Sequence, residues 1–186
     1  MNIITDQYTA PHTINLVLKR ARSLFNVTDE HENLIFKVRN RPFSWLRDAI
    51  VIQDSNGTTL ATLRQKFGKW CGYKGESITK SDCIFVVKHH SFFSMKTRMD
   101  VFLANNTSEK NCDFFLKQSS WGLNCTIYSG TTESNVQVAH IREKRNGSFC
   151  CGQIEFTNEI SPNVDQAFVV ALYVILDEDR RISSSS

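Results

Sequence analysis

The chain has 186 residues, of which 41% are hydrophobic and 11% aromatic, a composition typical of one globular domain with a large core. Its 22 basic and 19 acidic residues leave a formal net charge of +3, which is too small for a protein that coats nucleic acid. Residues 1–93 carry +5 and residues 94–186 carry −2, so we expect an anionic partner to prefer the first half.

The N-terminus predicts an intracellular protein, cytoplasmic or nuclear. Residues 1–7 contain neither the basic region nor the apolar stretch of a secretory signal. We therefore expect the six cysteines to be reduced and the six Asn-x-Ser/Thr sequons to be unused. Cys83, Cys112 and Cys125 stand in apolar or aromatic runs and are interpreted as small core residues.

Short apolar segments recur at near-regular spacing from residue 13 to about residue 157 and are interpreted as strands. Apolar Leu34, Phe36 and Val38 alternate with Lys37 and Arg39, which indicates one buried and one exposed strand face. An Asn-Gly pair at residues 56 and 57 predicts a tight hairpin turn. Twelve strands are predicted, at residues 14–19, 23–28, 34–39, 50–52, 60–63, 70–74, 83–88, 99–104, 113–117, 124–128, 136–143 and 153–157.

The C-terminal segment differs because residues 167–176 are apolar without a break. Pro162 and Asn163 precede this run, and Asp177 begins the charged stretch that follows it. We predict a helix at residues 164–177, about 21 Å long. Since it is apolar on every side, other elements must surround it. Ten apolar residues are too few to cross a hydrocarbon layer of about 30 Å, so no transmembrane span is predicted.

These patterns together predict a mainly β fold, a closed twelve-stranded barrel that encloses a central hydrophobic helix. A barrel of twelve strands is wider than one that its own side chains fill, so something must occupy its axis. The alternative is a sandwich in which residues 168–175 form a buried strand, because several of them have strong β propensity. The expected organisation is an N-terminal extension at residues 1–12, one barrel domain at residues 13–180 and a serine-rich tail at residues 181–186.

The sequence contains no motif that predicts an enzyme. It lacks a Gly-x-Ser-x-Gly elbow, a phosphate-binding loop, a dinucleotide-binding glycine pattern and a His-Glu-x-x-His pair. The five histidines are scattered, and His89 and His90 would point to opposite faces of a strand. No metal and no other cofactor is therefore predicted. Cys150 and Cys151 are adjacent and would diverge in a strand, which favours a core or edge role over a redox pair.

Cationic side chains on the predicted strand surfaces are the candidate binding residues. Two strands carry cations at alternate positions, which places each pair on one face about 6.7 Å apart. Such clusters engage phosphate groups, because arginine forks and lysine point charges suit them. The competing interpretation is that solvated lysine and arginine fill the outer face of any barrel. The candidates for binding lipid headgroups are Lys37, Arg39, Arg41, Arg47, Arg64 and Lys66.

Four blocks of the sequence resemble the plant LURP-one-related proteins. The turn before the first of these blocks departs from the family pattern. The family usually has an Asp-x-x-Gly turn before the strand at residues 34–38, whereas this chain has Asp29-Glu30-His31-Glu32-Asn33, so the geometry of that hairpin is left open. The blocks that carry the resemblance are Asn33-Leu34-Ile35-Phe36-Lys37-Val38, the segment 48–63 with Asp54-Ser55-Asn56-Gly57 at its turn, Trp70-x-x-Tyr73-Lys74-Gly75 and, most specifically, Val164-Asp165-Gln166-Ala167-Phe168.

The resemblance implies a twelve-stranded barrel around a central helix, similar to the Tubby C-terminal domain and to phospholipid scramblases. It also implies a non-enzymatic role in plant defence, and the related families suggest membrane tethering through phosphoinositides. We expect a monomer that binds anionic phospholipid peripherally, at the plasma membrane for example. The alternatives are a scaffold for signalling proteins and a Tubby-like, transcription-linked regulator without lipid binding. Lipid scrambling would need a spanning helix, and the low net charge argues against direct DNA binding.

Overall fold

The computed structural model describes residues 1–21, 24–41, 49–89, 98–119, 124–132, 136–146 and 153–184. Within these residues it contains twelve strands, one short 3-10 helix and one α-helix. Each of the twelve predicted strands overlaps an observed one. The elements are β1 Ile14–Ala21, β2 Leu24–Thr28, β3 Leu34–Arg41, β4 Ala49–Asp54, β5 Thr59–Lys66, β6 Lys69–Lys74, the 3-10 helix Lys80–Asp82, β7 Cys83–His89, β8 Arg98–Leu103, β9 Phe114–Gln118, β10 Cys125–Ser129, β11 Gln137–Asn146, β12 Gln153–Ile160 and α1 Gln166–Ser184.

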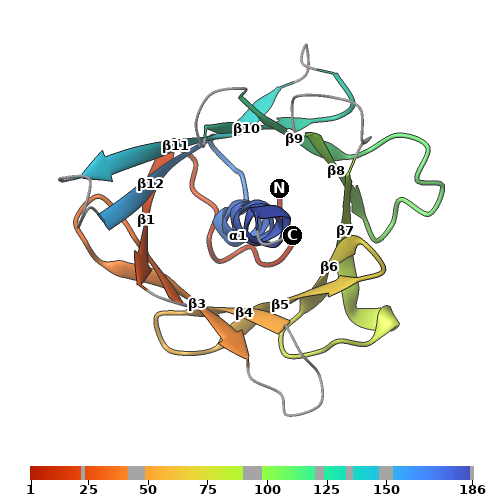
Figure 1. Cartoon of the computed structure of the whole chain (residues 1–186), viewed down its shortest axis with the longest axis horizontal. Coiled ribbons are helices and arrows are strands. Elements are labelled where there is room, and N and C mark those ends of the chain that lie inside the picture. Colours follow the sequence, from red (N-terminus) through yellow and green to blue (C-terminus); the bar gives the residue numbers. More distant parts are fainter. Residues whose placement is uncertain are drawn as a thin grey trace.

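The strands form one closed antiparallel barrel, and α1 runs along its axis (Figure 1). Each strand pairs with its neighbours in the sequence, and β12 closes the barrel by pairing with β1 from Ile14 opposite Ile160 to Lys19 opposite Glu155. The predicted barrel with a central helix is confirmed, and the alternative of a sandwich is wrong. No residue from Ala167 to Leu176 is more than 1% exposed, which shows that the helix fills the lumen of the barrel.

Aromatic contacts fix the helix against opposite walls of the barrel. The ring of Phe168 meets those of Phe85 on β7 and Phe114 on β9 edge to face, each at a centroid distance of 5.3 Å. Five residues further along the helix, the ring centroid of Tyr173 lies 4.8 Å from that of Phe156 on β12. Such aromatic pairs contribute stability beyond the burial of their surface area. The helix therefore has a defined position as well as an apolar environment.

Both ends of the predicted helix, residues 164–177, are corrected by the structure. The helix begins at Gln166 because Asp165 caps it, its Oδ1 accepting the N–H of Phe168 at 3.1 Å. It continues to Ser184 because the charged residues after Leu176 have partners. Asp177 pairs with Arg20, and Asp179 accepts from His89 Nε2 at 3.0 Å. Residues 181–184, predicted as tail, are therefore helical. Among the residues described, no helix combines the length and hydropathy that a membrane span needs.

The first twelve residues pack against the entrance of the barrel at which α1 begins. The backbone N–H groups of residues 3–5 all donate to Oδ2 of Asp165, at 2.6–3.0 Å. Tyr8 accepts the N–H of Gln166 through its carbonyl at 3.0 Å, and its ring lies 4.7 Å from that of Phe36. The segment thus ties the start of the chain to the start of its helix.

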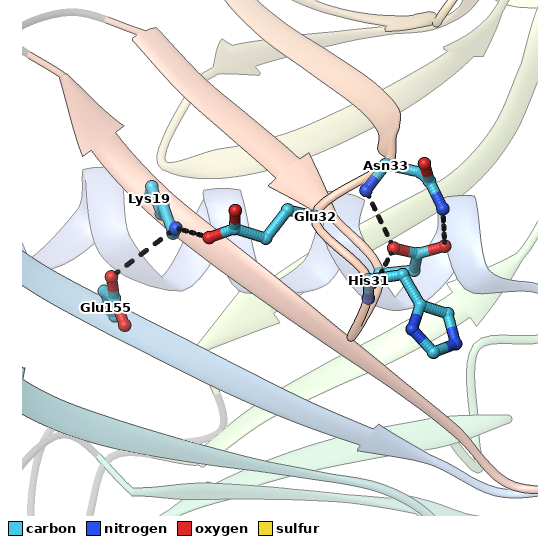
Figure 2. Close-up of polar contacts among 6 residues, drawn as sticks. Lys19, His31, Glu32, Asn33 and Glu155 are labelled. Atoms are coloured by element: carbon cyan, nitrogen blue, oxygen red, sulfur yellow. Dashed lines mark hydrogen bonds and ion pairs between the residues drawn. The ribbon is translucent and has the colours of Figure 1, made fainter.

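The β2–β3 hairpin keeps its turn although Glu32 stands where the resemblance implies glycine. Glu32 has φ of 64°, in the left-handed region that glycine favours. Asp29 holds the turn, since its Oδ1 accepts the N–H groups of His31 and Asn33 at 2.9 and 2.8 Å (Figure 2). The departure from the family pattern therefore changes the backbone strain of the turn and leaves the hairpin intact.

Glu32 also belongs to a chain of charges across three elements. Lys19 of β1 lies between two carboxylates, with its Nζ 3.3 Å from Glu32 and 3.8 Å from Glu155 of β12 (Figure 2). The pair with Glu32 is largely exposed, so its contribution to stability is small.

Candidate anion-binding groove

The structure separates the predicted cations by one strand. Lys37, Arg39 and Arg41 face outward from β3, because they alternate with core residues. β4 lies between β3 and β5, and Ala49 of β4 pairs with Arg41 on one side and with Arg64 on the other. Two strand spacings, about 9.6 Å, therefore separate the backbones of Arg41 and Arg64. Arg47 lies outside the described residues.

The β3 cations lie on an open face. Arg39 is exposed and Lys37 is half-buried. Arg41 donates from Nη2 to Oε2 of Glu76 at 3.2 Å, so a carboxylate already offsets its charge. These three residues form a charged strip on the outer face of β3. The strip has the character of a solvated barrel face, as the competing interpretation expects.

Lys66 instead borders a groove of about 540 Å³ on the outer face of the barrel. The groove lies over β6, β7 and β8, which are neighbours in the sheet (Figure 1), and Lys66 at the end of β5 borders it. Its floor consists of residues that alternate with the core residues Trp70, Phe85 and Val87 and therefore face outward. They are Cys71 and Tyr73 of β6 and Val86 of β7, and Cys83 joins them because the pairing of β6 with β7 shifts register between Gly72 and Tyr73.

The rim of the groove is cationic. Lys66 and Lys69 pair directly across the β5–β6 hairpin, and Lys80 of the 3-10 helix approaches from another side. Like charges directly opposite each other in a hairpin are destabilising, so this pair does not serve the hairpin itself. Among the described residues that line the groove, Glu109 is the one carboxylate, and Lys88 from outside the lining pairs with it.

The floor of the groove provides a neutral hydrogen-bond donor. Burial raises the pKa of Tyr73 to about 12, and the neighbouring thiol of Cys71 contributes to the rise. The phenol is therefore protonated at neutral pH. Burial also raises the pKa of Cys83, whose Sγ donates to the carbonyl of Phe85 at 3.5 Å. A protonated thiol is a poor nucleophile, so this floor is better suited to binding a ligand than to reacting with it.

The wall opposite the hairpin is held in place by hydrogen bonds. Asp113 accepts the N–H of Leu103 at 2.8 Å and the side-chain amide of Asn106 at 2.9 Å. Arg98 lies over the ring of Phe115 at 4.1 Å from its centroid, beside the buried ring of Phe102. This second apolar cluster, outside the barrel, fixes the segment after β8 and so gives the groove a preformed shape.

Sequence reasoning identified Lys66 but missed Lys69, Lys80 and Tyr73. The spacing Lys66-Phe67-Gly68-Lys69 was the available signal, because a two-residue turn places the flanking residues opposite each other. Lys80 and the wall after β8 gave no such signal, since the barrel alone brings them to β6. No group of three histidine, cysteine, aspartate or glutamate side chains able to hold a metal occurs among the described residues.

The four cysteines that the structure describes are free thiols. Cys125 lies in the core, as predicted, and burial raises its pKa to about 12. Cys112 is buried in the outer cluster with Phe102 and Phe115. Cys83 is half-buried in the groove instead of the core, because the register shift at the start of β7 turns it away from the core. Cys150 and Cys151 lie outside the described residues.

Comparison with known proteins identifies the relatives of the chain. The family described as LURP-one-related matches residues 15–177. Protein LURP-one-related 15 of Arabidopsis thaliana is 36% identical, over 96% of this chain and 86% of that protein. Protein LURP-one-related 10 of the same plant is 34% identical, over 99% of both chains. An X-ray structure of an Arabidopsis thaliana protein superposes with a TM-score of 0.77 at 34% identity, covering 96% of this chain and 98% of the other.

Proposed function

Because the chain belongs to the LURP-one-related family, we propose that it is a non-enzymatic protein of plant defence that binds anionic phospholipid headgroups at a membrane surface. The headgroups, phosphoinositides in particular, occupy the groove beside the β5–β6 hairpin. The observation that carries the proposal is the rim of Lys66, Lys69 and Lys80 around a protonated tyrosine. The four other described candidates, Lys37, Arg39, Arg41 and Arg64, add longer-range attraction to an anionic surface.

The chemistry of the groove fits phosphate groups. Its volume of about 540 Å³ lies within the usual range for ligand sites, about 300 to 1,000 Å³. Lysine binds phosphate as a point charge, and the Tyr73 hydroxyl can donate to a phosphate oxygen. A bound anion would also relieve the repulsion between Lys66 and Lys69, which gives the like-charged pair a reason to exist.

Vesicle co-sedimentation tests the proposal with two matched double variants. Lys66→Glu with Lys69→Glu reverses two charges at the groove, and Lys37→Glu with Arg39→Glu reverses two on the β3 strip. We expect wild-type protein to prefer phosphoinositide vesicles over phosphatidylcholine vesicles, less strongly at high salt because exposed charges are screened. The groove variant should bind at least tenfold more weakly and the β3 variant about threefold more weakly. Equal binding of wild type to both vesicles, or equal losses in both variants, contradicts the groove as the site.

The second candidate is a scaffold that binds an acidic protein partner through the β3 strip. It is favoured by the exposure of Arg39 and by the strand that separates the strip from the groove. The same two double variants decide between the candidates. A partner captured by wild type and by the groove variant, and lost by the β3 variant, supports the scaffold.

A further inference from the structure

The turn between β5 and β6 has an unusual residue at its tip. Phe67 and Gly68 connect Lys66 to Lys69, with φ of 49° and 73°. Two successive left-handed residues form the tight hairpin turn in which asparagine, aspartate and glycine are the favoured residues. A bulky aromatic residue in this conformation is a genuine outlier, since its Cβ crowds the backbone. Turn geometry therefore disfavours Phe67.

Packing does not compensate for this strain. The side chain of Phe67 is 100% exposed. Among the exposed large hydrophobic residues that the structure describes, Phe67 alone is aromatic. The others, including Val136 and Ile182, are 41–71% exposed. A residue that breaks a local rule and gains nothing within the fold points to a role outside it.

The neighbours of Phe67 indicate what it contacts. Lys66 and Lys69 flank it in the sequence, and Phe67 itself borders the cationic groove. An aromatic ring that projects beyond a pair of lysines matches the layering of a bilayer, with phosphates at the surface and acyl chains below. A protein partner would need an apolar pocket set between acidic groups at this spacing, whereas a membrane places acyl chains beneath every pair of its phosphates.

We propose, on the basis of the headgroup binding argued above, that the tip of the β5–β6 hairpin inserts into the membrane. The Phe67 ring enters the acyl region while Lys66, Lys69 and Lys80 hold phosphates at the surface. The barrel then contacts the membrane through its outer wall at this hairpin. Burial of a phenylalanine side chain contributes roughly tenfold or more to affinity.

Phe67→Asn tests insertion separately from folding. It creates Asn-Gly, the favoured pair for this turn, so the variant should unfold at a higher temperature than wild type. It should nevertheless bind phosphoinositide vesicles about tenfold more weakly and keep the salt dependence of wild type. Val136→Asn is the matched control, since it removes another exposed apolar side chain and should bind as wild type does.

A direct measurement uses Phe67→Trp with vesicles whose acyl chains carry bromine. Fluorescence should be quenched beyond the change that wild type shows with its three native tryptophans. Wild-type affinity of Phe67→Asn, or no added quenching in Phe67→Trp, overturns insertion. If the Lys66→Glu, Lys69→Glu variant loses binding in the same assay, headgroup recognition stands and insertion alone fails. If Phe67→Asn loses a protein partner and keeps vesicle binding, the tip contacts protein and the proposal is wrong.

Discussion

Asp165 is the residue that joins the start of the chain to the start of its helix. Its Oδ1 caps the helix at Phe168, and its Oδ2 accepts three backbone N–H groups from residues 3–5. The side chain is fully buried, so no water replaces these bonds. This geometry explains why the Val-Asp-Gln-Ala-Phe block carries the family resemblance most specifically. The aspartate is structural, and the groove lies elsewhere on the molecule.

Replacement of Asp165 by alanine should therefore be costly. It leaves the helix cap and three partly buried backbone donors without an acceptor, for an expected loss of roughly 3 kcal/mol in the free energy of unfolding. Urea denaturation measures the loss, and Asp6→Ala, at an exposed position of the same segment, is the control. A loss below about 1 kcal/mol would show that the N-terminal segment is not held by this carboxylate.

Glu32 gives a prediction about the backbone of the β2–β3 turn. Its φ of 64° is strained for any residue except glycine, so Glu32→Gly should be more stable than Glu32→Ala by about 0.5–1 kcal/mol. Both variants lose the pair with Lys19, so their difference reports the backbone alone. Thermal unfolding of the two proteins measures it. Equal stability would mean that the turn relaxes when the side chain is shortened.

At the scale of elements, Gly72 shows how a strand accommodates the helix. A Cβ at this position would overlap the ring of Phe85 on the neighbouring strand β7. Phe85 cannot retreat, because its ring lies against Phe168 of α1. The glycine is thus needed for a close approach between β6, β7 and the helix, and it requires no unusual backbone angle.

Gly72→Ala should lower the free energy of unfolding by about 1–3 kcal/mol through overpacking. Phe85→Leu provides the room that the methyl group needs, so the double variant should be more stable than the sum of the two single changes. A double-mutant cycle by urea denaturation measures this coupling. Additive losses would indicate that the methyl group contacts something other than Phe85.

At the scale of the whole molecule, His140 makes stability depend on pH. Burial lowers the pKa of His140 below its ordinary value of 6.5, and Arg142 lowers it further against the opposing effect of Glu159. Below pH 6.5 the unfolded chain therefore binds a proton that the folded chain resists. The contribution of His140 to stability is complete above that pH and is lost as the pH falls below it.

The expected result is a steeper fall of the unfolding temperature in wild type than in His140→Gln between pH 7.5 and pH 5.5. Glutamine keeps a polar group near Thr126, whose Oγ1 lies 2.9 Å from Nδ1 of His140. Comparison of the two proteins removes the contribution of the other titrating groups. Parallel pH profiles would show that His140 is protonated equally in both states.

The sequence predicts the barrel better than the groove, for a physical reason. The alternation at residues 34–38 and the unbroken apolar run at residues 167–176 are local patterns, so the sequence alone shows which residues must be buried. The ends of α1 depend on tertiary partners such as Arg20 and His89, so its length was underestimated. The groove depends on registers between strands, and no local pattern places Lys80 beside Tyr73.

The pairing of β1 with β12 has a consequence for synthesis of the protein. One edge of β1 pairs with β2, but its other edge has no partner until β12 is made, and α1 emerges from the ribosome after both. Until then the nascent chain exposes inward-facing residues that have no core to join, a situation that slows folding and invites aggregation. We therefore expect the nascent chain to be prone to aggregation until the helix has been made. A chain truncated before Gln166 would lack the helix that fills the barrel, and we expect it to aggregate instead of folding.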